Sequence, residues 1–173
     1  MQQGIEFLKS QVSLAALQHR TFLQALEDHE EQAKDQRFRD LCTRHIPHMR
    51  EHQRMLDDFQ REIGSEVGVV KKAIGGALGI AHQLADVASQ GDYLKLVGDI
   101  VMARQAEDTF KTFRDAGRVL GIQRLAEIGD IAERHHDVYA KEANRLVQQM
   151  FVEYARGAEQ IVPREAPRPN TAG

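Results

Sequence analysis

Apolar residues recur every three or four positions in four long stretches of the chain, and polar residues fill the positions between them. This spacing places the apolar side chains on one face of an α-helix, which turns about 100° per residue. The predicted helices span residues 5–33, 36–63, 93–116 and 123–154. No stretch alternates apolar and polar residues in the manner of a strand. The pattern therefore predicts an all-α protein built as a four-helix bundle.

The connection between the second and third predicted helices is unusually long. It covers residues 64–92 and is punctuated by glycines, and we expect it to hold one short helix at about residues 70–89. A connection of this length can cross the whole bundle, so the third helix can run parallel to the second. The helical domain should occupy residues 1–161. Residues 162–173, which contain Pro163, Pro167 and Pro169, should form a flexible tail.

Composition limits the number of domains, the partners and the location that we expect for the protein. A chain of 173 residues that is 42% hydrophobic and 28% charged suits one domain with a proper core. The net charge of −3 gives no reason to expect a nucleic-acid partner, because phosphate binding needs a concentrated basic face. The chain has a single cysteine, no signal-peptide pattern and no apolar run of membrane-spanning length. We expect a cytoplasmic homodimer without nucleic-acid or membrane partners.

Eight histidines are many for this length, and several interrupt the apolar faces. A weak internal duplication, offset by about 88 positions, aligns His19 with Glu107 and aligns His45 and His48 with Glu133 and His136. Residues three apart on a helix lie on the same side. His45 and His48 can therefore reach one metal ion together, and so can Glu133 and His136. Pro47 lies between His45 and His48 and predicts a kink, or a junction of two helices near residue 46.

Residues equidistant from a hairpin turn lie at the same height. A turn near Lys34 then places His19 level with His48, with His45 one turn away. A turn near residue 119 places Glu107 level with Glu133, with His136 beside it. If the two hairpins pack about a pseudo-twofold axis, these side chains converge in the middle of the bundle. The six candidate metal ligands are His19, His45, His48, Glu107, Glu133 and His136.

At these residues the chain resembles the ferritin-like superfamily, whose bundles carry one Glu on the first and third helices and Glu-x-x-His on the second and fourth. Glu107 and the pair Glu133 and His136 match the second half of that motif. The first half departs from it, because His19 and the pair His45 and His48 stand where carboxylates are expected. The resemblance implies a ferritin-like bundle with a His-rich first half, and a function in oxygen or peroxide chemistry or in metal sequestration under stress.

The departures change the chemistry that we expect. Carboxylates bridge two metal ions, whereas a neutral imidazole ordinarily binds one. One ion held mainly by imidazoles is therefore easier to support than a di-iron centre. Such a ligand set suits iron, zinc, nickel or copper more than magnesium or calcium. We expect a divalent transition metal, with iron, zinc or manganese as the leading candidates.

A metal-free interpretation stays open. Facing histidines and glutamates can satisfy one another as buried ion pairs, as in a structural or stress-related bundle that has lost its site. His52, one turn beyond His48, is an alternate ligand or a supporting residue, and His135 lies on the flank of its helix. Whether the protein is an enzyme is not decided by these patterns.

Overall fold

A computed structural model of the chain describes residues 2–65 and 91–156. Four α-helices account for nearly all of them: α1 (Gln2–Gln32), α2 (Gln36–Glu62), α4 (Asp92–Leu120) and α5 (Gln123–Tyr154). Within these two ranges there is no β-strand. The protein is therefore an all-helical bundle, as the apolar periodicity predicts. The short helix expected at residues 70–89 and the tail expected at 162–173 lie outside the described residues.

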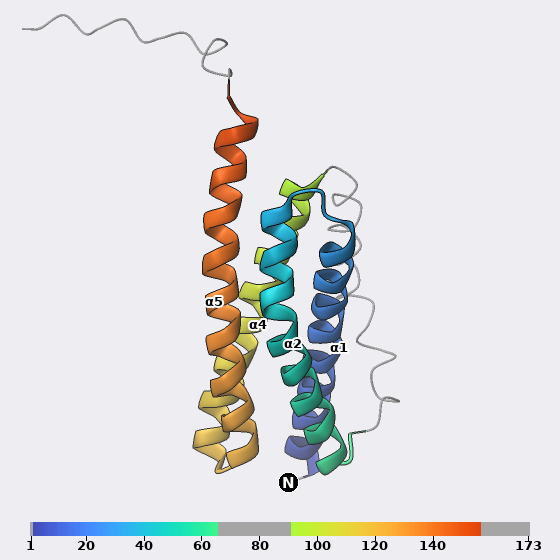
Figure 1. The fold of residues 1–173 in the computed structure, drawn as a ribbon. Helices are drawn as coiled ribbons and strands as arrows, with labels where there is room; N and C mark the ends of the chain where they lie inside the picture. The colour runs from blue at the N-terminus through green and yellow to red at the C-terminus, as the bar shows by residue number, and fades with distance from the viewer. Residues whose placement is uncertain (1, 66–90, 157–173) are drawn as a thin grey trace, which may run out of the picture.

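The bundle consists of two antiparallel hairpins, α1 with α2 and α4 with α5 (Figure 1). The hairpins pack through α2 against α5 and through α1 against α4. Helices α2 and α4 run in the same direction, which is the arrangement that the length of the connection between them predicts (Figure 1). Side-chain contacts mark the two ends of that connection. Ser65 hydrogen-bonds to Ser13 at one end of the bundle, whereas Asp92 accepts from the backbone of Lys34 and Asp35 at the other.

The helix ends follow local chemistry. The Asp35 carboxylate accepts a hydrogen bond from the backbone N–H of Arg37 at 2.9 Å, so it caps the start of α2. Helix α2 then runs unbroken through Pro47, so the alternative of two helices meeting near residue 46 is wrong. Helix α4 continues past Gly117 and ends at Gly121, whose φ of 70° is left-handed.

Two glycines allow α4 and α5 to approach closely. A Cβ atom on Gly129 would lie 2.3 Å from the backbone nitrogen of Arg114 and 2.5 Å from the carbonyl oxygen of Phe110. A Cβ atom on Gly117 would lie 2.5 Å from the backbone nitrogen of Ala126. Only glycine fits at these two contacts, so Gly117 serves the packing of α4 against α5, and α4 continues beyond the predicted end at residue 116 to Leu120.

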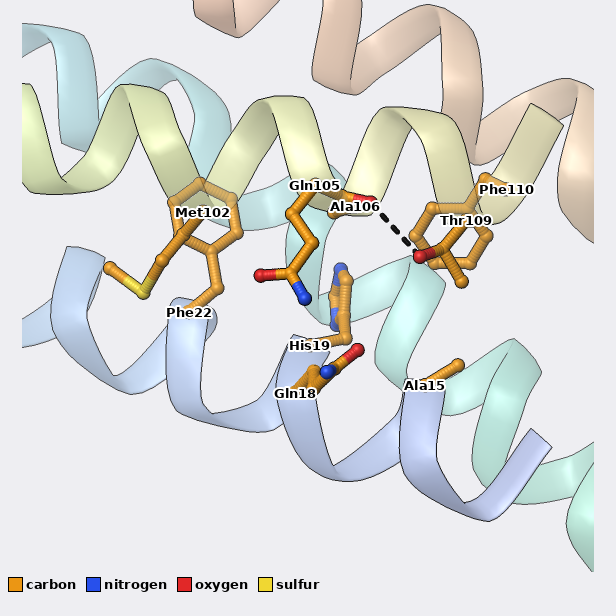
Figure 2. A pocket seen from close by; sticks show the side chains of 9 residues that line it. All are labelled: Ala15, Gln18, His19, Phe22, Met102, Gln105, Ala106, Thr109 and Phe110. Atoms are coloured by element: carbon orange, nitrogen blue, oxygen red, sulfur yellow. Dashed lines mark hydrogen bonds between the residues drawn. The ribbon is translucent and has the colours of Figure 1, made fainter. Parts of the chain in front are cut away.

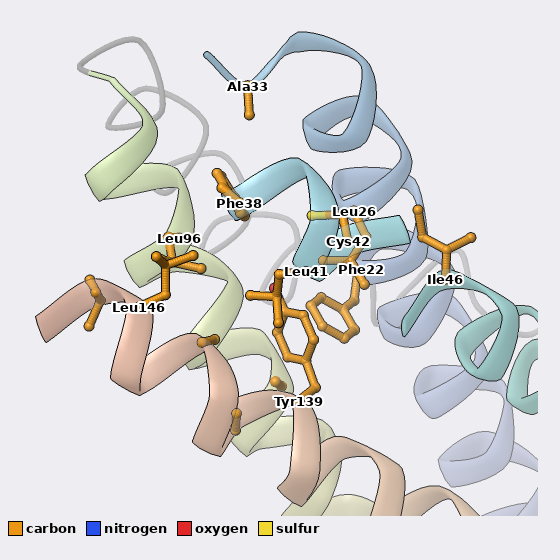
Figure 3. Close-up of a cluster of buried hydrophobic side chains, with 14 of the residues drawn as sticks. Phe22, Leu26, Ala33, Phe38, Leu41, Cys42, Ile46, Leu96, Tyr139 and Leu146 are labelled. Atoms are coloured by element: carbon orange, nitrogen blue, oxygen red, sulfur yellow. The ribbon is translucent and has the colours of Figure 1, made fainter. Parts of the chain in front are cut away.

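The interior contains two apolar clusters, one towards each end of the bundle. One cluster, around Phe22, Leu41 and Tyr139, lies towards the α1–α2 turn (Figure 3). The other lies towards the α4–α5 turn and includes Val12, Leu56 and Ile128. On α1, α2 and α5 the boundary between the clusters is occupied by a buried histidine. The three histidines are His19, His52 and His136.

No helix in the described part of the chain combines the length and the apolar character needed to cross a membrane.

Candidate metal centre

Three helices each contribute one buried histidine to a single point inside the bundle. The side chains of His52 and His136 are fully buried, and His19 is 2% exposed. One ring nitrogen of each lies within 4.8 Å of a ring nitrogen of both others. Their ring centroids are 5.2 to 5.7 Å apart. Among the described residues, this is the one group of three or more such side chains close enough to hold an ion.

Helical spacing explains why these rings point inward. His19 follows Val12 and Ala15 on the apolar face of α1, His52 follows Met49 on α2, and His136 follows Ala132 on α5. Each histidine thus occupies a core position, at an interval where the helix places apolar side chains.

The fourth helix closes the site with an aromatic ring. Phe110 of α4 lies with its ring centroid 5.1 Å from that of His136, 5.7 Å from His19 and 6.2 Å from His52. Phe22 of α1 contacts His136 at 5.8 Å. Aromatic rings of α1 and α4 therefore pack against the histidines.

Hydrogen bonds fix which nitrogen of two rings carries the proton. Nδ1 of His136 donates to the carbonyl oxygen of Ala132 at 2.7 Å. Nδ1 of His19 donates to the side-chain oxygen of Gln53 at 3.0 Å, since an amide oxygen can only accept. In both rings Nε2 is consequently left with a free lone pair. Neither Nε2 has a hydrogen-bond partner within the described residues.

The third ring has a histidine as its outer partner. Nε2 of His52 lies 2.7 Å from Nδ1 of His135. When His52 is the donor, its own Nδ1 carries a lone pair, and that nitrogen is also buried and unpartnered within the described residues. Outer hydrogen bonds of this kind orient the imidazoles that bind metal ions in proteins and select their tautomers. With His52 as the donor to His135, the three rings therefore direct three lone pairs towards one another inside the bundle.

Burial keeps these imidazoles neutral. It lowers the pKa of His19 to about 4 against the opposing effect of the bond to Gln53, and it lowers the pKa of His136 to about 3. Burial, together with the neighbouring histidines, also lowers the pKa of His52 far below its ordinary value. The neutral form is the one that binds a metal ion.

Of the six ligands predicted from the sequence, the structure brings together His19 and His136 only. Glu107 accepts a hydrogen bond from Arg104, and Glu133 accepts one from Arg114. Both carboxylates lie at the flank of their helices, where a partly exposed arginine can reach them. The expected convergence of Glu107 and Glu133 with His136 is therefore not found, and Phe110 takes the place on α4 that Glu107 was expected to occupy.

The two other predicted ligands on α2 also lie elsewhere. His45 contacts Glu142, with 3.2 Å between Nε2 and the carboxylate oxygen, and its ring packs against Tyr139. His48 is exposed, and its ring lies 4.2 Å from that of His135. His52, which the sequence suggests only as an alternate ligand, is the residue of α2 that joins the cluster. The apolar stripe pointed to it, because Met49, His52 and Leu56 share one face of the helix.

The metal-free alternative required ion pairs between glutamates and the central histidines. The arginine partners of Glu107 and Glu133 leave no such pair at His19, His52 or His136. The arrangement of the described residues therefore differs from the His/Glu network that the alternative assumed.

Comparisons with family models, with curated proteins and with solved structures give no match for this chain. The functional argument consequently rests on the site itself.

Proposed function

We propose that this protein binds one transition-metal ion at His19, His52 and His136. The observation that carries the proposal is the meeting of three buried, neutral imidazoles whose inward nitrogens lack any partner among the described residues. A buried polar atom without a partner costs roughly 1–3 kcal/mol. In the tautomer in which His52 donates to His135, three facing lone pairs cannot satisfy one another, because each needs a donor or a cation. A bound ion would offset the cost at all three rings together.

The geometry suits an ion after a small movement. Two nitrogens bound to a tetrahedral zinc ion lie about 3.4 Å apart, given Zn–N bonds of about 2.0–2.1 Å. The nitrogens here lie within 4.8 Å of one another, so modest rotations of the rings are needed. Three histidines leave the fourth position of such an ion open, which is typical of reactive rather than purely structural sites.

The ligand set favours particular metals. Imidazole nitrogens suit zinc, copper, iron and nickel, whereas manganese prefers carboxylate, carbonyl and water oxygens. Of the three metals expected from the sequence, iron and zinc fit this site better than manganese. A second ion is not part of the proposal, because Glu107 and Glu133, the carboxylates that would bridge two ions, are paired with arginines.

The ferritin-like character of the bundle also remains part of the proposal. It is supported by the order of the two hairpins and by the parallel run of α2 and α4 (Figure 1). A di-metal carboxylate centre is not supported. We infer a mononuclear variant of that architecture, and the chemistry of oxygen or peroxide that the resemblance implies would take place at one ion.

The test is the metal content of protein purified without a histidine tag, measured by elemental analysis, followed by titration of the metal-free protein with Zn²⁺ and Co²⁺. We expect about one ion per chain in the wild type. His136→Phe should reduce binding to a small fraction of that value, because phenylalanine fills the space between Phe22 and Phe110 without offering a ligand. His48→Ala is the matched control, since His48 is an exposed histidine outside the cluster.

Two results would reject the proposal. One is wild-type protein that neither contains nor takes up a stoichiometric ion. The other is His136→Phe protein with normal helical content that binds metal as the wild type does. The first result would favour the alternative function, a structural bundle whose buried histidines serve packing alone.

A further inference from the structure

A small pocket between α1 and α4 is lined in part by His19, one member of the histidine cluster. Its volume is about 30 Å³, and it is lined by residues of these two helices only, with His19 and Phe110 among them (Figure 2). Both of these residues contact the rings of His52 and His136. Gln105, which is exposed, lies at the pocket and gives it contact with solvent. The pocket therefore joins the outside to the edge of the proposed metal site.

The size of the pocket limits what it can admit. A water molecule needs about 10–15 Å³ of such space, so the pocket holds two or three molecules of that size. The lining includes the small side chains of Ala15 and Ala106. A larger side chain at either position would fill much of the space. The pocket thus fits a molecule of one to three heavy atoms.

The charges around the site favour an anion. The pocket lining contains no Asp, Glu, Lys or Arg. Three neutral imidazoles leave the full charge of a divalent ion uncompensated, and a buried charge without a counter-charge is unfavourable. The carboxylates of Glu107 and Glu133 are already engaged by Arg104 and Arg114. A small anion in the open position would reduce the net charge of the centre.

The lining also offers polar groups for such an occupant. The side-chain amides of Gln18 and Gln105 can donate N–H groups into the pocket, beside the ring of His19 (Figure 2). The hydroxyl of Thr109 donates to the carbonyl oxygen of Gln105 and is not free to donate elsewhere. Neutral amide donors in a lining without Lys or Arg suit an anion that binds weakly and exchanges.

We propose that the pocket between α1 and α4 admits a small monoanion, of the size of hydroxide, hydroperoxide or azide, to the open position of the ion held by the three histidines. This inference rests on the proposed metal site. It names the class of ligand or substrate that the site takes and the side from which it arrives.

The experiment uses the full chain loaded with Co²⁺, whose visible absorption reports its coordination. Metal content is measured first, and azide is then added. Azide should change the spectrum of the wild type, whereas benzoate, which is too large for the pocket, should not. Ala106→Leu should fill the pocket and weaken azide binding at least tenfold while Co²⁺ remains bound. Ala116 is, like Ala106, a partly buried alanine of α4, but it lies outside the pocket. Ala116→Leu should therefore behave as the wild type.

A second variant guards against a folding defect in Ala106→Leu. Gln105→Trp adds bulk at an exposed position, so it should leave the core intact and slow the binding of azide. The inference is overturned if azide does not bind to the Co²⁺-loaded wild type, or if Gln105→Trp and correctly folded Ala106→Leu bind it as the wild type does. In both cases the metal site itself would stand. A wild type that takes up no Co²⁺ would instead reject the proposed function, and this inference with it.

Discussion

His52 of α2 and His135 of α5 face each other across the interface of the two hairpins, with 2.7 Å between Nε2 of His52 and Nδ1 of His135. Their rings are stacked at an interplanar angle of 21°. His48 lies on the outer side of His135. The three histidines form a series from the surface to the buried cluster, and the inner contact determines whether His52 has a lone pair to offer to a metal ion.

This contact predicts a role for His135 in metal affinity. Its removal should leave Nε2 of His52 without its partner, so the tautomer and the orientation of the ring are no longer held. Loss of such an outer hydrogen bond typically reduces metal affinity about 10- to 100-fold. His135→Ala should show a reduction in this range when the metal-free protein is titrated with Zn²⁺ against a competing chelator. His48→Ala should change affinity far less, and equal losses in both variants would contradict the assigned role.

The lowered pKa values of the central histidines predict a pH dependence of the metal-free protein. The unfolded chain protonates these histidines near their ordinary pKa of about 6.5, whereas the folded protein resists protonation until about pH 4 at His19 and about pH 3 at His136. Between these values the unfolded state binds more protons. The free energy of unfolding should therefore decrease as pH falls below about 6.5, by up to about 1.4 kcal/mol per pH unit for each histidine.

Urea unfolding of metal-free protein at a series of pH values measures this dependence. Replacing one ring by an aromatic side chain that does not titrate, as in His136→Phe, should make the dependence on pH shallower. Identical slopes for His136→Phe and wild type between pH 6.5 and 4 would show that His136 does not titrate as described.

The close approach of α4 and α5 predicts a large effect of a single methyl group. Gly129→Ala places a Cβ atom against the backbone of Phe110 and Arg114, and neither can move without shifting the whole helix. Overpacking of this kind costs about 1–3 kcal/mol or more. Thermal unfolding should show a clear loss of stability. Gly4→Ala is the control, because a Cβ atom there meets nothing within 4 Å and alanine favours the helix.

The hydrogen bonds of Asp92 predict that the contact between the start of α4 and the α1–α2 turn contributes to stability. One oxygen of this carboxylate, which is 8% exposed, accepts from the backbone N–H groups of Lys34 and Asp35 at 2.6 and 2.7 Å. A hydrogen bond to a charged group contributes about 1.5–3 kcal/mol. Asp92→Ala should therefore lower the free energy of unfolding by roughly 2–4 kcal/mol in denaturant titrations, with two bonds lost and partial replacement by water. Asp108→Ala, at an exposed position of the same helix, should have little effect.

The fold was largely accessible from the sequence because it depends on local periodicity. The apolar stripes placed all four described helices to within a few residues at most ends. The exception is the end of α4, which lies at Leu120, beyond Gly117 and beyond the predicted end at residue 116. A glycine that ends a helix and a glycine that permits close helix packing are identical in the sequence. Only the position of Ala126 against Gly117 separates the two cases.

The site was accessible only in part. Mirror symmetry about Lys34 placed His19 beside His48, but the contacts of α1 lie further along α2: His19 bonds to Gln53, and Arg20 to Asp57. This register decides that His52, rather than His45 or His48, meets His19. The tilt and offset of two packed helices depend on how their side chains interlock, which a pattern on one helix does not specify.

The sequence by itself determined the number and approximate length of the four helices, the direction of the third relative to the second, and the presence of histidines on core faces. These follow from the 3.6-residue repeat and the length of one connection. The tertiary structure alone decided which ionisable side chains meet. In the packed bundle Glu107 and Glu133 lie beside arginines at the flanks of their helices, and Phe110 lies against His136. Convergence of side chains is a property of the packing of all four helices, and it is set by their relative rotation and register.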